Sequence, residues 1–193
     1  MNKSGARRPR PGATRKSPLR TATALRAHHL LCVLGFRGLG YSREFVENMS
    51  RIVGRIKSTP DTELLLTDLC DDVCSACPHR KGRRCARKPD SATRVRDLDR
   101  RVLARLGLKP RAKISARRAY ALVAASIATL RSSEGSLRST STPDQLEGDI
   151  CGDCEWKRLR LCSEGLKSLA DGRFFTERSC QPSAVSRQHK RHS

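Results

Sequence analysis

The sequence predicts a mostly α-helical small domain, of the α+β class with a minor β element, in which two cysteine-rich loops supply metal ligands. Three observations support this prediction. Apolar residues recur at helical spacing over much of the chain, one short run is typical of a strand, and two cysteine triplets of equal spacing lie in polar segments. At 193 residues the chain is long enough for one domain with its own core.

Basic arms are expected on both sides of this domain. The first 43 residues contain ten Lys and Arg and no acidic residue. Residues 1–24 are rich in Pro, Gly, Ser and Arg, and such a segment has too little apolar area to offset the entropy cost of ordering it. The sequence therefore predicts a disordered basic arm over residues 1–24, a cysteine-rich metal-binding domain over 25–172 and a basic, disordered tail over 173–193.

The clearest helix follows Ser42, whose side chain can cap the first turn. Apolar residues recur at the spacing of one helix face from Phe45 to Ile56, and Pro60 ends the pattern. Weaker patterns predict four more helices, namely a buried one within 25–36, one from Val95 to Leu106, one from Ser115 to Leu130 and a terminal one over 163–172.

The best strand candidate is TELLLTD, residues 62–68, in which leucine and threonine are bounded by turn residues. The first cysteine-rich loop follows this segment directly. We therefore expect the metal ligands to lie in loops between elements rather than within a sheet.

Nine cysteines are present, and six of them form two triplets with the spacing Cys-x2-Cys-x7-Cys. Two cysteines separated by two residues can turn their sulfurs toward one point, and the third adds another ligand for a metal ion or an iron–sulfur cluster. Basic neighbours such as Arg80 and Lys157 are expected to lower the pKa values of these thiols. The triplets are Cys74, Cys77 and Cys85, and Cys151, Cys154 and Cys162.

Cys70 permits a different grouping. With Cys74 and Cys77 it gives Cys-x3-Cys-x2-Cys, a spacing that resembles the cluster motif of radical S-adenosylmethionine enzymes. Those enzymes are built on a large α/β barrel of roughly 200 residues or more, and this chain lacks the alternating strands and helices of a barrel. Cys70 also has no counterpart in the second triplet, since Glu147 stands four positions before Cys151. We therefore assign Cys70 no role.

The fourth ligands are expected upstream, in the motif HHLLC. His28 and His29 precede Cys32 by four and three residues, so on a helix either histidine can share a face with the thiol. Cys32 would then complete one site and a histidine the other. The alternative is that the two histidines form a polar pair at a helix end and bind nothing.

An iron–sulfur cluster is the preferred cofactor, either one in each loop or one shared between the loops, and zinc is the alternative. The pairs Cys74 with Cys77 and Cys151 with Cys154 could hold one zinc ion unaided. That arrangement would leave the third cysteine of each triplet unused, which favours the cluster. An iron–sulfur protein would transfer electrons or sense redox state, with a redox partner, whereas a zinc protein would be a structural module that binds nucleic acid or protein.

Other chemistries are weaker alternatives. Disulfides are typical of exported proteins, and a dithiol redox motif normally lies in a thioredoxin-like strand pattern that is missing here. Acid–base catalysis by acids beside the cysteine loops is a further alternative. No phosphate-binding loop, nucleophile elbow or dinucleotide fingerprint occurs in the sequence, so no reaction or catalytic residue is assigned. The acids concerned are Asp71, Asp72, Asp149 and Asp153.

A cytoplasmic location is expected. No apolar run approaches the roughly 18 to 20 residues of a membrane span, and no apolar segment follows the basic N-terminus as in a secretory signal. The net charge of +21 is carried largely by the arms, which would bind nucleic acid weakly and without sequence specificity. No membrane partner is expected.

Four segments together resemble the domain of unknown function 1284 family of bacterial and archaeal proteins, namely LRAHHLLCVLGFRGLGYSREFVENMSRIV, PDTELLLTD, DDVCSACPH and ICGDCEWKRLRLC. The resemblance covers about residues 25–169. It implies an iron–sulfur binding protein for which no reaction is established. The matching positions are His28, His29 and Cys32 together with both triplets, whereas Cys70 departs from the family's pattern.

Overall fold

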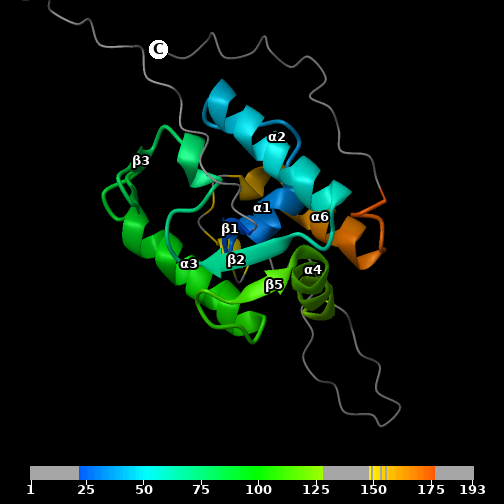
Figure 1. Ribbon diagram of the computed structural model, residues 1–193. Helices are drawn as coiled ribbons and strands as arrows, with labels where there is room; N and C mark the ends of the chain where they lie inside the picture. The colour runs from blue at the N-terminus through cyan, green and yellow to red at the C-terminus, as the bar shows by residue number, and fades with distance from the viewer. Residues whose placement is uncertain (1–21, 128–147, 149, 153, 155, 177–193) are drawn as a thin grey trace, which may run out of the picture.

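The computed structural model describes residues 22–127, 148, 150–152, 154 and 156–176. Within them, five α-helices surround a small sheet, and a two-stranded hairpin lies apart from it (Figure 1). The predicted fold class, mostly helical with a minor β element, is therefore confirmed.

The main sheet has three strands in the order β1, β2, β5. β1 (Thr23–Arg26) pairs in parallel with β2 (Glu63–Thr67), so that Ala24 lies opposite Leu65. β5 (Lys113–Ser115) pairs with the other edge of β2 in the antiparallel direction. The predicted strand over 62–68 is thus confirmed as the central strand.

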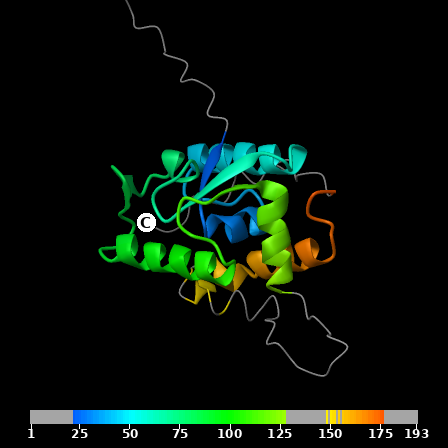
Figure 2. The same ribbon diagram turned by 60° about the horizontal axis from the view of Figure 1, so that its bottom comes forward.

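The helices cover the sheet on more than one side. Figure 2 shows α1 near the centre of the molecule, with α2 on one side and α3 and α6 on the other. Five of the seven residues of α1 are buried. The helix bounds are α1 His29–Gly35, α2 Arg43–Ser58, α3 Ser91–Arg105, α4 Ala116–Ala125 and α6 Leu161–Ala170.

Two glycines let α1 and α6 approach closely. A Cβ atom at Gly165 of α6 would lie 2.4 Å from the backbone carbonyl of Leu34 in α1, and one at Gly35 would lie 2.8 Å from the backbone N of Cys162. Both distances are shorter than side chains tolerate, so only glycine allows the two backbones to pack this way. The contact brings Cys162, near the start of α6, against the end of α1.

The predicted cap at Ser42 is confirmed, and Ser115 caps the next predicted helix start in the same way. The Ser42 Oγ atom accepts a hydrogen bond from the backbone N–H of Phe45 at 3.2 Å, and the Ser115 Oγ atom accepts one from Arg118, also at 3.2 Å. The predicted helix starting near Val95 begins four residues earlier, at Ser91. The predicted extension of the helix from Ser115 beyond residue 127 lies outside the described residues.

The ordered core extends slightly past the predicted domain limits. β1 begins at Thr23, two residues before the expected boundary, because its backbone pairs with β2. Phe174 falls in the predicted tail but is only 3 % exposed, and its ring packs against Tyr120 with centroids 4.8 Å apart. The rest of both predicted arms lies outside the described residues. None of the described helices combines the length and apolar character needed to cross a bilayer.

Candidate metal centre

The first cysteine loop, residues 70–85, is called the hairpin loop here. Cys74 begins a 3-10 turn, η1 (Cys74–Ala76), and Cys77 follows it directly, while Cys85 ends a hairpin of β3 (Arg80–Lys81) and β4 (Arg84–Cys85). Arg80 pairs with Cys85 across the hairpin, and the Arg80 N–H donates to the Cys77 carbonyl at 3.1 Å. The hairpin therefore returns the third cysteine of the triplet toward the second.

Cys70, which the sequence pattern left without a role, belongs to the same neighbourhood. Burial raises the pKa of the Cys77 thiol, and the thiols of Cys85 and Cys70 raise it further, while backbone N–H groups that hydrogen-bond its sulfur oppose the change. Burial and the charges of Asp71 and Cys70 likewise raise the pKa of Cys74. The hairpin loop thus holds four thiols in one neighbourhood, although no three of them lie within 4.8 Å of one another in the described residues. We call them the hairpin set: Cys70, Cys74, Cys77 and Cys85.

The second triplet lies with Cys32 around a cavity of about 570 Å³. The four cysteines come from α1, from the segment before η2 (Lys157–Leu159) and from α6. Burial raises the pKa of the Cys32 thiol well above its usual range, and the other three thiols raise it further. We call this group the cavity set: Cys32, Cys151, Cys154 and Cys162.

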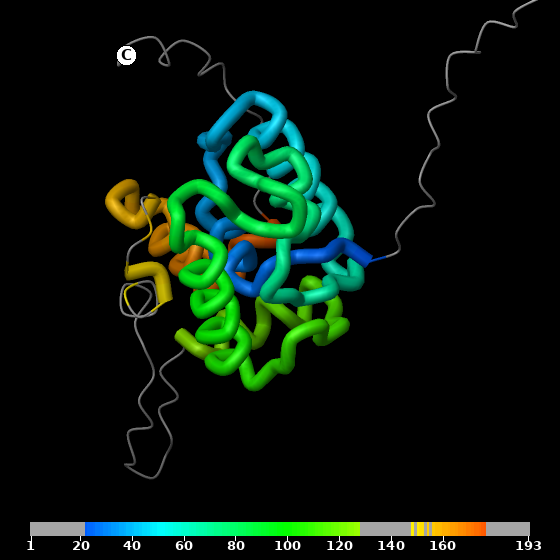
Figure 3. The backbone as a smooth tube through the Cα atoms, turned by 90° about the vertical axis from the view of Figure 1, so that its left-hand side faces the viewer, coloured from blue at the N-terminus to red at the C-terminus, as the bar shows by residue number. Residues whose placement is uncertain are grey.

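The two sets occupy different places. Of the described residues that line the cavity, four are the cysteines of the cavity set and none belongs to the hairpin set. Figure 3 shows the second loop, in yellow, beside α3. There the Arg101 guanidinium donates to the Ile150 carbonyl at 3.4 Å. Cys32 and the second triplet therefore lie at the same cavity.

The predicted lowering of the thiol pKa values is wrong for Cys74 and Cys77. Both pKa values are raised, chiefly because burial disfavours the charged thiolate. The basic side chains of the hairpin, such as Arg80 and Arg84, are exposed and directed to solvent, where water screens their charge. A buried thiol of this kind ionises readily only when a metal ion takes the place of its proton.

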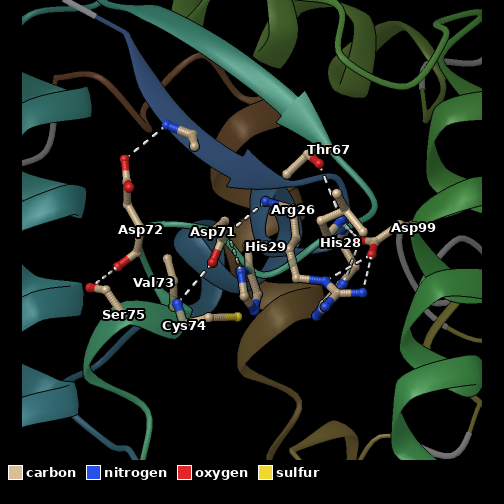
Figure 4. A network of polar contacts seen from close by, with 12 residues as sticks. Arg26, His28, His29, Thr67, Asp71, Asp72, Val73, Cys74, Ser75 and Asp99 are labelled. Carbon is tan, nitrogen blue, oxygen red and sulfur yellow. Dashed lines mark hydrogen bonds and ion pairs between the residues drawn. The ribbon is translucent and has the colours of Figure 1, made fainter. Parts of the chain in front are cut away.

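His28 and His29 are each held by a buried carboxylate (Figure 4). The Nδ1 atom of His28 lies 2.7 Å from Asp99 Oδ1, and that of His29 lies 2.7 Å from Asp71 Oδ2. Both carboxylates are fully buried and both rings are only 13 % exposed. Because Nδ1 faces the carboxylate in each ring, Nε2 is the nitrogen left for any other partner. Both histidines also line the cavity.

Asp71 connects the hairpin loop to β1 and α1. Its Oδ2 atom accepts the Arg26 backbone N–H as well as the His29 contact, and its Oδ1 atom accepts the Cys74 N–H at 2.8 Å. Burial alone would raise the pKa of Asp71, but the charge and hydrogen bond of His29 and the backbone donors outweigh burial and hold it at about 2. Asp71 is therefore an ionised carboxylate that positions its neighbours.

Asp99 positions His28 in the same way as Asp71 positions His29. It accepts hydrogen bonds from Arg26 Nε at 2.8 Å and from the His28 backbone N–H at 3.1 Å, in addition to the ring contact. Sequence reasoning missed both Arg26 and Asp99. A signal for Asp99 was present, since it interrupts the apolar face of its helix between Val95 and Val102, where a charge is expensive unless it is paired.

One group of ligand atoms is already close together. The potential ligand atoms of His29, Asp71 and Cys74 all lie within 4.8 Å of one another, which makes them a candidate metal site. Figure 4 shows the Cys74 side chain directed toward the His29 ring. Two of the three, His29 and Cys74, were predicted ligands. Asp71 was considered only as a catalytic acid.

Of the other acids considered for catalysis, the structure describes Asp72, which binds backbone. Asp72 accepts the backbone N–H of Ala24 at 2.9 Å and thereby anchors the loop to β1. Asp149 and Asp153 lie outside the described residues. The Asp71 oxygens are all engaged as described above, so both described acids beside the first loop bind backbone.

The fold and these side chains define a small, mostly helical, cysteine-rich protein with a candidate metal site. A family model matches residues 40–162, more than half of the chain, and its description is a protein of unknown function, DUF1284. The chain therefore belongs to that family, and the resemblance noted in the sequence is confirmed. The matched range contains both cysteine triplets but begins after the HHLLC motif. Neither the curated proteins nor the solved structures contain a match.

Proposed function

We propose that the protein binds an iron–sulfur cluster through the cavity set and that it transfers electrons or senses redox state. One observation carries this proposal. Four cysteines from segments far apart in the sequence line a single cavity. Without an inorganic group, four thiols around a cavity would contribute little, because a thiol is only weakly polar. Four thiolates are the usual ligand set of an iron–sulfur cluster.

The size of the cavity supports a cluster over a single ion. In a tetrahedral zinc site with bonds of about 2.3 Å, the four sulfurs lie roughly 3.8 Å apart and close around the metal. A cluster contains several irons and sulfides, so its ligand sulfurs surround a larger space. The cavity of about 570 Å³ is large enough for the irons and sulfides of a cluster, with further space next to them.

The hairpin set forms the second centre in this proposal. Cys74, Cys77 and Cys85 supply three thiolates, and Cys70, which lies in the same loop, supplies the fourth. The backbone N–H groups at the Cys77 sulfur would stabilise its thiolate once a metal is bound. The centre can be either a second cluster or a zinc ion.

The hairpin loop also supports the second candidate function, a structural zinc protein that binds nucleic acid or protein. A short turn followed by a two-stranded hairpin is a common support for a four-thiolate zinc ion. The hairpin carries four exposed cations, which suit a polyanionic partner. They are Arg80, Lys81, Arg83 and Arg84.

Metal and sulfide analysis of anaerobically purified protein tests the proposal. We expect a brown protein with iron and acid-labile sulfide in equal amounts. Cys32→Ala should lose the sulfide of the cavity set, while Cys180→Ala, a cysteine in neither set and outside the described residues, should keep it. A colourless protein with stoichiometric zinc and no sulfide would contradict the first candidate and support the second.

A further inference from the structure

We propose that His28 and His29 bind a divalent transition-metal ion of their own through their Nε2 atoms, with its open coordination positions facing the cavity. This proposal goes beyond the cysteine centres and does not depend on which inorganic group the cysteines hold. It concerns the two histidines and their carboxylates, of which His29 and Asp71 also lie close to Cys74.

The first argument is the geometry of the two rings. Each Nδ1 atom lies 2.7 Å from a carboxylate oxygen that is fully buried. A histidine that binds a metal almost always donates its other ring N–H to a carboxylate or carbonyl, because this contact fixes the tautomer and the ring orientation. Here two adjacent residues have that arrangement at once, although each carboxylate comes from a different element.

The second argument is that the two rings lie side by side. Their centroids are 4.3 Å apart, with the ring planes inclined at 56°. Two imidazoles at this separation are close enough to be ligands of one ion. The pair stands where β1 ends and α1 begins, on backbone that is held by hydrogen bonds to Asp71 and Asp99.

The third argument is access. Both rings line the cavity of about 570 Å³. Two nitrogens leave positions for water or a small molecule on a four-coordinate ion, as in catalytic rather than structural sites. Neutral imidazole suits zinc, iron(II), cobalt(II) and similar ions of intermediate softness, whereas magnesium and calcium prefer oxygen.

Each carboxylate has further donors besides its histidine. Arg26 lies 2.6 Å from Asp99 Oδ2, and Asp71 accepts two backbone N–H groups. The histidine contacts are nevertheless the largest of the interactions that lower the pKa of each carboxylate, ahead of Arg26 for Asp99. Each carboxylate is therefore fixed in place with one oxygen facing a histidine Nδ1 atom.

Cobalt(II) is the probe. The protein is first reconstituted with iron and sulfide so that the thiols are occupied, and His189 and His192, outside the described residues, are changed to Gln in every sample to remove other imidazoles. Binding is measured by calorimetry and by visible and X-ray absorption at the cobalt edge. We expect one cobalt per chain with nitrogen and oxygen ligands at about 2.0–2.1 Å and no sulfur at about 2.3 Å.

Three variants in this background identify the ligands. His28→Gln and His29→Gln should each weaken cobalt binding at least tenfold, and Asp99→Asn should weaken it by about 10- to 100-fold with both histidines kept. His79→Gln is the matched control, because His79 packs on Tyr41 rather than on the pair, and it should change nothing.

The proposal is overturned if cobalt binds equally well to both histidine variants, or if the cobalt edge shows a sulfur ligand, which would place the ion at Cys74 or Cys32. The cobalt-edge spectrum of the parent protein shows whether sulfur is a ligand, even if a variant does not fold. Iron and sulfide contents are measured on the same samples. Absence of iron and sulfide from the parent protein would count against the proposed function, and absence of cobalt binding to the parent protein would count against the histidine site.

Discussion

The hairpin loop and the second cysteine loop have the same Cys-x2-Cys-x7-Cys spacing but different surroundings. The hairpin set is local, since all four of its cysteines lie within residues 70–85, and it sits outside the cavity. The cavity set needs Cys32 from α1 and Cys162 from α6, which meet only because two glycines let the helices touch. Equal spacing in the sequence therefore does not produce equal sites.

This difference shows what cysteine spacing specifies. A Cys-x2-Cys turn directs two sulfurs to one side of a loop, whatever follows. The fourth ligand, the room around the sulfurs and the access to them depend on the elements that pack against the loop. The hairpin loop contains a hairpin within its own residues, whereas the second cysteine loop lies against α1, α3 and α6.

The largest effect is expected from removing one ligand of each set. Cys154→Ala should lose the metal of the cavity set and retain that of the hairpin set, and Cys77→Ala should do the reverse, because each set has its own four thiols. Elemental analysis and sulfide assay of both variants check this. Loss of all metal in either variant would mean that the loops share one centre.

A smaller effect is expected at the contact between α1 and α6. Gly165→Ala places a Cβ atom 2.4 Å from the Leu34 backbone, so the helices must separate and the free energy of unfolding should fall by about 1–3 kcal/mol or more. The cavity set should bind its metal less tightly, and the hairpin set should be unchanged. Denaturant unfolding and chelator competition measure the two effects.

Gly54→Ala is the control for that change. Gly54 lies in α2, and a Cβ atom there meets no other atom within 4 Å. Alanine should therefore stabilise the protein, by up to about 1 kcal/mol, through its helix propensity. A loss of stability in Gly165→Ala no greater than in Gly54→Ala would show that close packing of α1 and α6 does not matter.

Acid should weaken the connection that Asp71 makes between the hairpin loop, β1 and α1. The pKa of Asp71 is about 2 in the folded protein against 3.8 ordinarily, so its contribution to stability is complete above about pH 4 and is lost as pH falls toward 2. The loss is about 2 kcal/mol. Asp71→Asn should remove this pH dependence in the metal-free, reduced protein, as followed by urea unfolding at each pH. Retention of the full dependence in Asp71→Asn would exclude this carboxylate as its source.

The Asp71 prediction also has a matched control. Asp61 is 75 % exposed and pairs with Arg117 on the surface. Asp61→Asn should therefore keep the parent's loss of stability between pH 4 and pH 2. If it lost as much of the dependence as Asp71→Asn, surface charge rather than the buried carboxylate would explain the effect.

The smallest effect is expected in the turn of the hairpin. Gly82 has a φ angle of +59°, which an L side chain adopts at a cost of about 1 kcal/mol. A Cβ atom there meets nothing within 4 Å, so strain is the whole effect. Gly82→Ala should weaken metal binding by the hairpin set about fivefold and leave the cavity set unchanged. Equal weakening of both sets in a chelator titration would contradict their independence.

Most helices could be predicted from the sequence because each depends on its own residues. The apolar face of α2 and the Ser42 cap lie within one segment, and so do the cap and first turns of α4. β1 could not be predicted, because its four residues carry too short a pattern and its strand character comes from pairing with β2, forty residues away.

The sequence indicated the cysteines and histidines of the candidate site, but not the carboxylates that hold the histidines in place. The motif HHLLC indicated His29 and Cys32, while nothing local to it indicates Asp71 or Asp99. These carboxylates lie 42 and 71 residues from the histidines they hold. Contacts over such distances are decided by how the helices pack, which spacing alone does not contain.

The distance between Cys32 and Cys162 bears on the timing of assembly. If the two sets hold metal as proposed, the hairpin set has all its cysteines as soon as residue 85 has left the ribosome. The cavity set must wait for a cysteine 130 residues beyond its first member. On the proposed function, the first centre could therefore be filled during synthesis, whereas a factor that delivers a cofactor to the cavity could act only after Cys162 has been made.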